Sequence, residues 1–218
     1  GTLTRTNYSF GGWNINGTVY AAGANYTLTA NATANAIWNG DVYTITYNSN
    51  TATGGALAKA TDTYTVGTSS AIVLPGAGTM TRTGYTFGGW SLAAGTDGAG
   101  TGAVLSPYTP SASLTLYAIW TPNTYTITYN RNYGTTTTLT DTYTYGNTTA
   151  LQFNSGWTRT GYTFLGYSTN STDTTALTSY TVTSDATLYA IWQINSYTIT
   201  YSKNDGSGTT SNQNYNYG

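Results

Sequence analysis

The chain has 218 residues, of which 39% are hydrophobic, 15% are aromatic and only 6% are charged, and its net charge is −1. About a quarter of the residues are charged in ordinary globular proteins, so solubility here must come from hydroxyl and amide side chains. The chain has no basic stripe and lacks Cys, His and Glu. These features argue against a nucleic-acid partner, disulfides, the usual zinc sites and triad or paired-carboxylate catalysis. We therefore expect neither an enzyme nor a cofactor.

A repeated set of short phrases organises the sequence, and repeats of this length are typical of tandem arrays. Three phrases each occur three times. A ten-residue phrase that begins with TRTxYxF covers residues 4–13, 81–90 and 158–167. The phrase AIW covers residues 36–38, 118–120 and 190–192, and YTITY covers residues 43–47, 125–129 and 197–201.

The frame predicts four segments. Residues 1–38 form the C-terminal half of a repeat, 43–120 and 125–192 form complete repeats, and 197–218 form the N-terminal half of another. Four residues always separate AIW from YTITY, which favours neighbours held in a fixed relation over a loose linker. The two half-repeats fit either a window within a longer array or a subunit whose halves complete each other across a junction.

The elements of the first complete repeat, in chain order, all follow strand patterns. Residues 43–47, 62–66 and 85–90 alternate apolar and polar side chains with a period of two, which indicates half-buried strands. Residues 114–120 are apolar on both faces, which is typical of a central strand. At most one short helical turn fits, within 68–73 or 147–153. No apolar run reaches the roughly 18 residues of a membrane helix.

The three copies of YTITY are expected to be equivalent strands, with Ile45, Ile127 and Ile199 in like environments. The core of the first complete repeat is predicted to be rich in aromatic residues. Its expected members are Tyr43, Ile45, Tyr64, Leu74, Tyr85, Phe87, Trp90, Leu116, Ala118 and Trp120.

Four residues are candidates for an interface or ligand contact. Arg5, Arg82 and Arg159 recur once in each TRT phrase, so they are either a row of binding cations or groups that fix their own repeat. We favour the second interpretation, by pairing with an Asp or stacking on a Tyr. Trp157 lies outside the repeated pattern and is the better candidate for a surface or interface aromatic residue.

The stretch 95–102 has some likeness to a calcium loop. It offers a single carboxylate, Asp97, where such loops use several oxygen ligands. We expect a plain flexible loop there and no metal site.

Four phrases together resemble the Listeria–Bacteroides repeat family, known as the B-repeat of internalins and from many bacterial surface proteins. They are YTITYN…G at 125–134, YTYG at 143–146, RTGYTFGGW at 82–90 and LYAIW at 116–120. The resemblance implies small β-grasp-like domains in tandem on secreted or surface-anchored proteins, acting as stalks or interaction modules. Family members usually carry more Asp, Glu and Lys than this chain.

The expected fold is predominantly β, with tandem small β-rich, β-grasp-like repeat domains in an elongated array. The expected function is a structural segment of an extracellular bacterial surface fibre or adhesin stalk. Its partners would be other copies of itself, associating end to end or laterally, and polymerisation by completion of split repeats is the sharper form of this hypothesis. The alternative is an adhesion module for carbohydrate or a host receptor, with contacts from exposed Tyr side chains and Trp157.

Overall fold

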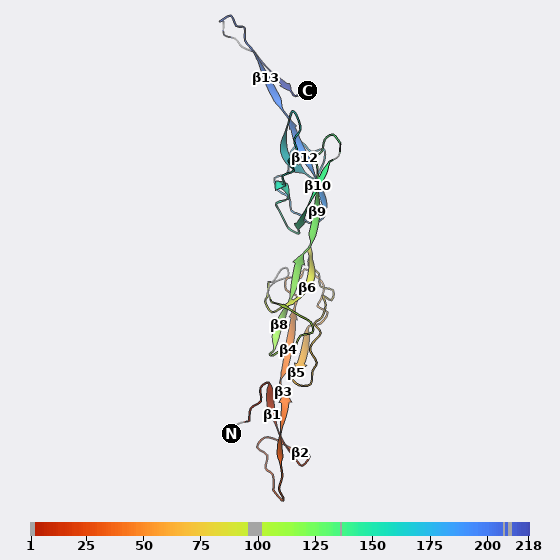
Figure 1. The fold of residues 1–218 in the computed structure, drawn as a ribbon, viewed down its shortest axis with the longest axis vertical. Helices are drawn as coiled ribbons and strands as arrows, with labels where there is room; N and C mark the ends of the chain where they lie inside the picture. Colours follow the sequence, from red (N-terminus) through yellow and green to blue (C-terminus); the bar gives the residue numbers. More distant parts are fainter. Residues whose placement is uncertain (1–2, 96–101, 136, 207, 209–210) are drawn as a thin grey trace. The chain divides into compact units, whose positions relative to one another are not determined.

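The computed structural model describes residues 3–95, 102–135, 137–206, 208 and 211–218. The chain divides into two compact units, residues 1–121 and 122–218, and each is described by itself below. Strands make up nearly all the regular structure of the described residues, and the one helical element among them is the 3₁₀ turn η1, Ala150–Gln152 (Figure 1). The predominantly β class expected from the sequence is confirmed. The turn η1 falls within the predicted 147–153, and 68–73 holds no helical turn.

The first unit begins with the half-repeat. It is a three-stranded antiparallel sheet with the order β2-β1-β3, formed by β1 (Tyr8–Ile15), β2 (Thr18–Tyr20) and β3 (Ala34–Gly40).

A bulge in this sheet explains the paired glycines of the TRT phrase. The register of β1 shifts between Phe10 and Gly12, and Gly12 has a φ of 122°. The equivalent strand of the second unit shifts between Phe164 and Gly166, where Gly166 has a φ of 133°. Leu165 occupies the first position of that pair, so only the second position requires the conformational freedom of glycine.

The first complete repeat is a five-stranded sheet of mixed direction. Its strands are β4 (Val42–Asn48), β5 (Thr61–Thr65), β6 (Tyr85–Ser91), β7 (Ala103–Val104) and β8 (Leu114–Pro122), in the order β5-β4-β8-β6-β7. The strand that enters the repeat, β4, pairs in parallel with the strand that leaves it, β8, and Ile45 lies opposite Leu114. The prediction that 114–120 form a central strand is confirmed.

The second unit contains the second complete repeat and the last half-repeat. The repeat has the order β10-β9-β12-β11, from β9 (Thr124–Asn130), β10 (Thr138–Thr144), β11 (Tyr162–Ser168) and β12 (Ala186–Ile194). Again β9 and β12 pair in parallel, with Ile127 opposite Ala186. The half-repeat is the antiparallel hairpin of β13 (Ser196–Tyr201) and β14 (Ser211–Asn216).

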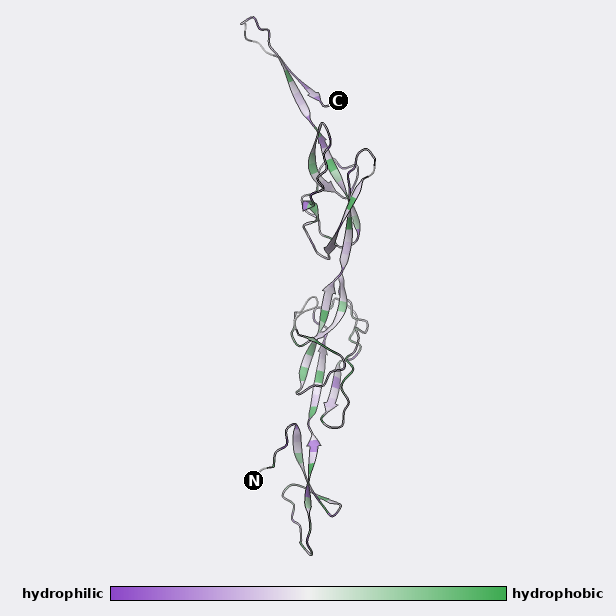
Figure 2. Cartoon of the chain, viewed as in Figure 1, coloured by the Kyte–Doolittle hydropathy of each residue, from purple (hydrophilic) through white to green (hydrophobic). Residues whose placement is uncertain are grey.

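Each complete repeat has its own apolar core, built on the alternation of the strands. In β4, Ile45 and Tyr47 are buried while Thr44 and Thr46 are exposed, and the apolar residues in Figure 2 recur along the strands accordingly. The first core consists of Ile45, Tyr47, Ile72, Met80, Trp90, Leu116, Ala118 and Trp120. The second consists of Ile127, Tyr129, Ala150, Tyr167, Val182, Leu188 and Ala190.

The predicted core of the first repeat is largely confirmed, with one member misplaced and three missed. Tyr43 packs outside this core, whereas Tyr47 at the other end of the same strand face lies inside it. Ile72 and Met80 come from the irregular segment between β5 and β6, where no periodicity marks them. Tyr64, Leu74, Tyr85 and Phe87 pack against the core while half-buried.

The third copy of YTITY does not share the environment of the first two. Ile45 and Ile127 are 0% exposed, but Ile199 is 48% exposed. The expectation of like environments is therefore wrong for Ile199. Among the residues that the structure describes, β13 pairs with β14 alone, whereas β4 and β9 are also paired with β8 and β12.

Candidate functional site

Single residues join one repeat to the next. Asp41 stands between β3 and β4, Asn123 between β8 and β9, and Asn195 between β12 and β13. The four residues that separate the repeated phrases are therefore mostly strand, and the connection itself is one residue long. At Asp41 and Asn195, which each lie within one unit, a connection this short restricts how far the neighbouring strands can move independently.

The joint at Asp41 is held by backbone hydrogen bonds on both sides. The Asp41 N–H donates to the Asn7 carbonyl of the preceding half-repeat at 3.0 Å. The Asp41 carbonyl accepts from the Val66 N–H of the following repeat, also at 3.0 Å. The Tyr8 hydroxyl also packs there, so closely that a Cβ at Gly67 would lie 2.4 Å from its oxygen. Glycine at position 67 thus allows the two repeats to approach each other.

The joint at Asn195 repeats this arrangement within the second unit. The Asn195 N–H donates to the Gly161 carbonyl at 2.8 Å, and the Asn195 carbonyl accepts from the Tyr217 N–H at 2.9 Å. The Tyr217 ring covers Gly161, where a Cβ would lie 1.9 Å from the ring. Asn123 makes the corresponding bond to the repeat that follows it, by accepting from the Tyr145 N–H at 2.8 Å.

The three repeated arginines each stack on a tyrosine three residues later in the chain. The guanidinium carbon lies 3.8 Å from the ring centroid for Arg5 on Tyr8, 3.8 Å for Arg82 on Tyr85 and 3.5 Å for Arg159 on Tyr162. In each pair the tyrosine N–H also donates to the arginine carbonyl, at 3.0, 2.9 and 3.0 Å. This geometry supports the interpretation that each arginine fixes its own TRT turn.

Two further candidates from the sequence are Trp157, for a ligand or interface contact, and the stretch around Asp97, for calcium. Trp157 is half-buried and packs against the second core, so only part of its ring is accessible. An open cavity of about 540 Å³ lies beside Arg82, Tyr85 and Trp120. The stretch around Asp97 lies outside the described residues. Among the residues that the structure describes, no three carboxylate, Cys or His side chains gather as metal ligands.

Two hydrogen bonds lock the leaving strand of each complete repeat to the turn after the entering strand. The Trp120 indole N–H donates to the Ser49 carbonyl at 3.0 Å, and the Asn50 side-chain amide donates to the Ala118 carbonyl at 2.8 Å. Asn50 reaches this position because its backbone is left-handed, with a φ of 43°, a conformation that Asn tolerates better than most residues.

The second repeat has the same lock. The Trp192 indole N–H donates to the Arg131 carbonyl at 2.9 Å, and the Asn132 amide donates to the Ala190 carbonyl at 3.1 Å. Asn-x-Asn at 48–50 and 130–132 is the sequence signal for this lock. Its part in the lock could not be read from the sequence.

A third bond extends the parallel pairing at its beginning. The Thr44 N–H donates to the Ser113 hydroxyl oxygen at 2.9 Å, and the Thr126 N–H donates to a carboxylate oxygen of Asp185 at 2.8 Å. These acceptors occupy equivalent positions, one residue before β8 and β12. The parallel contact of each repeat is therefore hydrogen-bonded from its first residue to the Asn-x-Asn turn.

The buried tyrosine of each entering strand is held neutral. Burial raises the pKa of Tyr47, and its hydroxyl donates to Asp62 at 3.0 Å. Burial likewise raises the pKa of Tyr129, whose hydroxyl bonds with that of Tyr143 at 2.7 Å and donates to the Ala150 carbonyl at 2.9 Å. These hydroxyls have structural partners and are not poised for acid–base chemistry.

Comparison with known proteins identifies the repeat. The Listeria–Bacteroides repeat domain matches residues 1–36, 43–119 and 125–191. The chain belongs to the Listeria–Bacteroides repeat family. A putative Gly-rich membrane protein of Evansella cellulosilytica is 30% identical over 222 residues, which cover 95% of this chain and 24% of that protein. The chain thus spans about a quarter of the length of this relative. Within the described part of the chain, no helix has the length and apolar character needed to cross a bilayer.

Proposed function

We propose that this tandem-repeat chain is a tension-bearing structural segment of an extracellular bacterial surface fibre or adhesin stalk. The observation that carries the proposal is the parallel pairing of the strands that enter and leave each complete repeat, β4 with β8 and β9 with β12. Membership of the Listeria–Bacteroides repeat family and the likeness to a Gly-rich membrane protein support placement at the cell surface.

Parallel terminal strands resist tension because of where the force acts. A pull on the chain draws the start of β9 and the end of β12 in opposite directions along their common axis. The bonds between the strands are then loaded together in shear, and none can break well before the others. The lock at Trp192 and Asn132 and the bond at Asp185 add to the same contact.

The joints suit the same role, since they pass force from strand to strand. Asp41 and Asn195 each hydrogen-bond to the repeat on either side, so a joint has no slack segment to extend before the load reaches the next strand. The adhesion-module alternative has less support, because its candidate contact Trp157 is half-buried and packs against the second core.

Single-molecule force spectroscopy tests the proposal, and the chain's lack of Cys allows the pulling points to be chosen by two introduced thiols. Thr124→Cys with Gln193→Cys loads β9 and β12 in shear. Thr124→Cys with Ser184→Cys pulls the same two strands apart from one end. All three positions are exposed. The shear pair should unfold at a clearly higher force than the peeling pair. Equal forces for the two pairs would remove the basis of the proposal.

A further inference from the structure

The second complete repeat brings two of the chain's 6 cationic side chains to one aromatic ring. The guanidinium carbon of Arg131 lies 4.4 Å from the centroid of the Tyr133 ring, and that of Arg159 lies 5.1 Å from the same centroid. Arg131 directly follows β9, whereas Arg159 precedes β11, so the fold brings them together. The first complete repeat has Ser49 and Thr51 in place of Arg131 and Tyr133. Of the two complete repeats, only the second therefore has this arginine pair.

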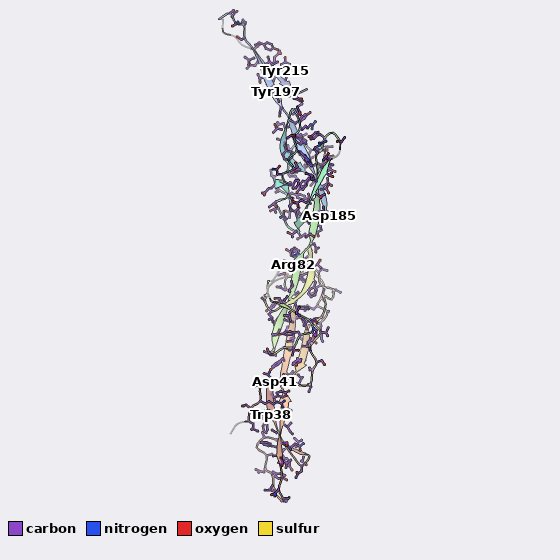
Figure 3. The ribbon with its side chains drawn as sticks, viewed as in Figure 1. Trp38, Asp41, Arg82, Asp185, Tyr197 and Tyr215 are labelled. Atoms are coloured by element: carbon purple, nitrogen blue, oxygen red, sulfur yellow. The ribbon has the colours of Figure 1, made fainter. Side chains whose placement is uncertain are left out.

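The aspartates of the second repeat do not neutralise the pair. Asp141 lies within β10, and Asp173 accepts a hydrogen bond from a serine hydroxyl. Asp185 stands at the start of β9 (Figure 3), whereas Arg131 follows the end of that strand. Among the residues that the structure describes, the one ion pair lies in the first unit. Both arginines are half-buried, and charges withdrawn from water are normally paired, so the pair favours an anion from outside the chain.

The repeat holds both guanidinium groups in place and leaves donors available. The Arg131 Nε donates to the Tyr133 carbonyl at 3.4 Å, and its Nη2 donates to the Thr135 carbonyl at 3.0 Å. Arg159 stacks on Tyr162 at 3.5 Å, a contact that uses the face of the guanidinium and not its N–H edge. Each guanidinium has five N–H donors in a rigid fork. A fork that is already held in place loses little freedom when it binds a carboxylate or phosphate.

We propose that Arg131 and Arg159 form a binding site for the oxyanions of an acidic polymer, whether carboxylates or phosphodiesters. Two guanidinium groups within about 5 Å of one ring match two neighbouring anionic groups on one chain. Once the first anion is bound, the second contact is intramolecular, which raises the affinity above that for a single anion. The inference is independent of the proposed function, since a stalk that bears tension needs no ligand.

The ring that lies beside both arginines is itself fixed. Tyr133 packs edge to face on Trp192, with the ring centroids 5.3 Å apart, and its hydroxyl donates to the Thr158 carbonyl. The net charge of −1 gives the chain no long-range attraction for an acidic polymer, so binding depends on the local contacts. We therefore expect binding that added salt weakens.

Isothermal titration calorimetry of the 218-residue chain is the first test. Polygalacturonate supplies carboxylates, polyphosphate supplies phosphates, and dextran is the neutral control. At least one acidic polymer should bind, and the preferred one identifies the anion. Acetate or inorganic phosphate, at the same concentration of anionic groups, should bind at least about tenfold more weakly. Failure of both acidic polymers to bind, equal binding of dextran, or equal binding of the small anions would overturn the inference.

Substitution of Arg131 then tests the site. Arg131→Gln should weaken binding at least about tenfold, and Arg131→Lys should weaken it less, because lysine keeps the charge but not the fork. The lock at Trp192 uses the Arg131 backbone carbonyl, so both variants keep it. The matched control is Arg82→Gln, which removes the same charge from the first repeat (Figure 3) and should leave the affinity unchanged. Unchanged affinity for Arg131→Gln, or an equal loss for Arg82→Gln, would refute the site.

Nuclear magnetic resonance of the unsubstituted chain provides a test that does not depend on a variant. During titration with the polymer that binds, the side-chain Nε–H signals of Arg131 and Arg159 should shift together and saturate. The signals of Arg5 and Arg82, which stack on tyrosines in the same way, should stay in place. Equal shifts of all four signals would indicate non-specific attraction and would overturn the inference.

Discussion

Replacing Ile127 by Ala should destabilise the second complete repeat strongly, whereas the same change at Ile199 should have almost no effect on the stability of the 218-residue chain. The substitution removes three carbon atoms. At about 0.8 kcal/mol for each buried carbon, the transfer cost at the fully buried Ile127 is about 2.4 kcal/mol. An unfilled cavity raises the cost, and substitutions of this type span about 2–5 kcal/mol. Ile199 is half-exposed in the hairpin, where changes stay within about 0.5 kcal/mol.

Urea unfolding followed by tryptophan fluorescence measures the difference. A loss of about 3 kcal/mol lowers the midpoint by about 1–3 M for a domain of this size. The two variants share the residue type, the strand phrase and the position within the phrase, so each controls for the other. Equal midpoints for Ile127→Ala and the unmodified chain would refute the burial argument. A large shift for Ile199→Ala would show that one face of β13 is covered.

Three further predictions concern the hydrogen bonds, the tyrosines and the bulge. Asp185→Ala should cost about 0.5–1.5 kcal/mol of unfolding free energy by removing the acceptor of the Thr126 N–H, whereas Ser184→Ala should be neutral in the same urea titration. Because burial raises the pKa of Tyr129 in the folded state, the unfolded chain loses that proton first as the pH rises. The associated stability is therefore complete below about pH 10 and falls above it by about 1.4 kcal/mol per pH unit for each such tyrosine. Tyr129→Phe should reduce the slope of unfolding free energy against pH, and an unchanged slope would contradict the assignment. Gly166→Ala should cost about 1–3 kcal/mol by thermal unfolding, since it imposes a strained φ in the bulge; an unchanged melting temperature would show that the bulge does not need glycine.

The sequence predicted the features that depend on periodicity. Alternation identified the strands around Ile45 and Ile127, and the doubly apolar run at 114–120 identified the central strand. The core residues Ile72, Met80 and Val182 were not predicted, because they lie in irregular segments where burial depends on how the chain folds back over the sheet.

In the candidate functional site, too, contacts within one short phrase could be predicted from the sequence, whereas contacts between distant residues could not. Stacking of each repeated arginine on a tyrosine could be proposed because both lie in one short phrase. The lock formed by Asn50 could not, since its acceptor, the Ala118 carbonyl, is 68 residues away. The exposure of Ile199 was also missed, because an identical phrase gives a buried strand only where a leaving strand covers it.

The parallel pairing of entering and leaving strands is the central claim, and amide hydrogen exchange of the 218-residue chain tests it most directly. Peptides that cover β4, β9 and β13 contain nearly the same sequence, so differences in exchange reflect their surroundings. The peptides from β4 and β9 should exchange slowly and at similar rates, because each strand is paired on both edges. The peptide from β13 should exchange far faster, since an isolated two-stranded hairpin is marginally stable in water. Fast exchange in β4 or β9, or protection of β13 equal to theirs, would contradict the account.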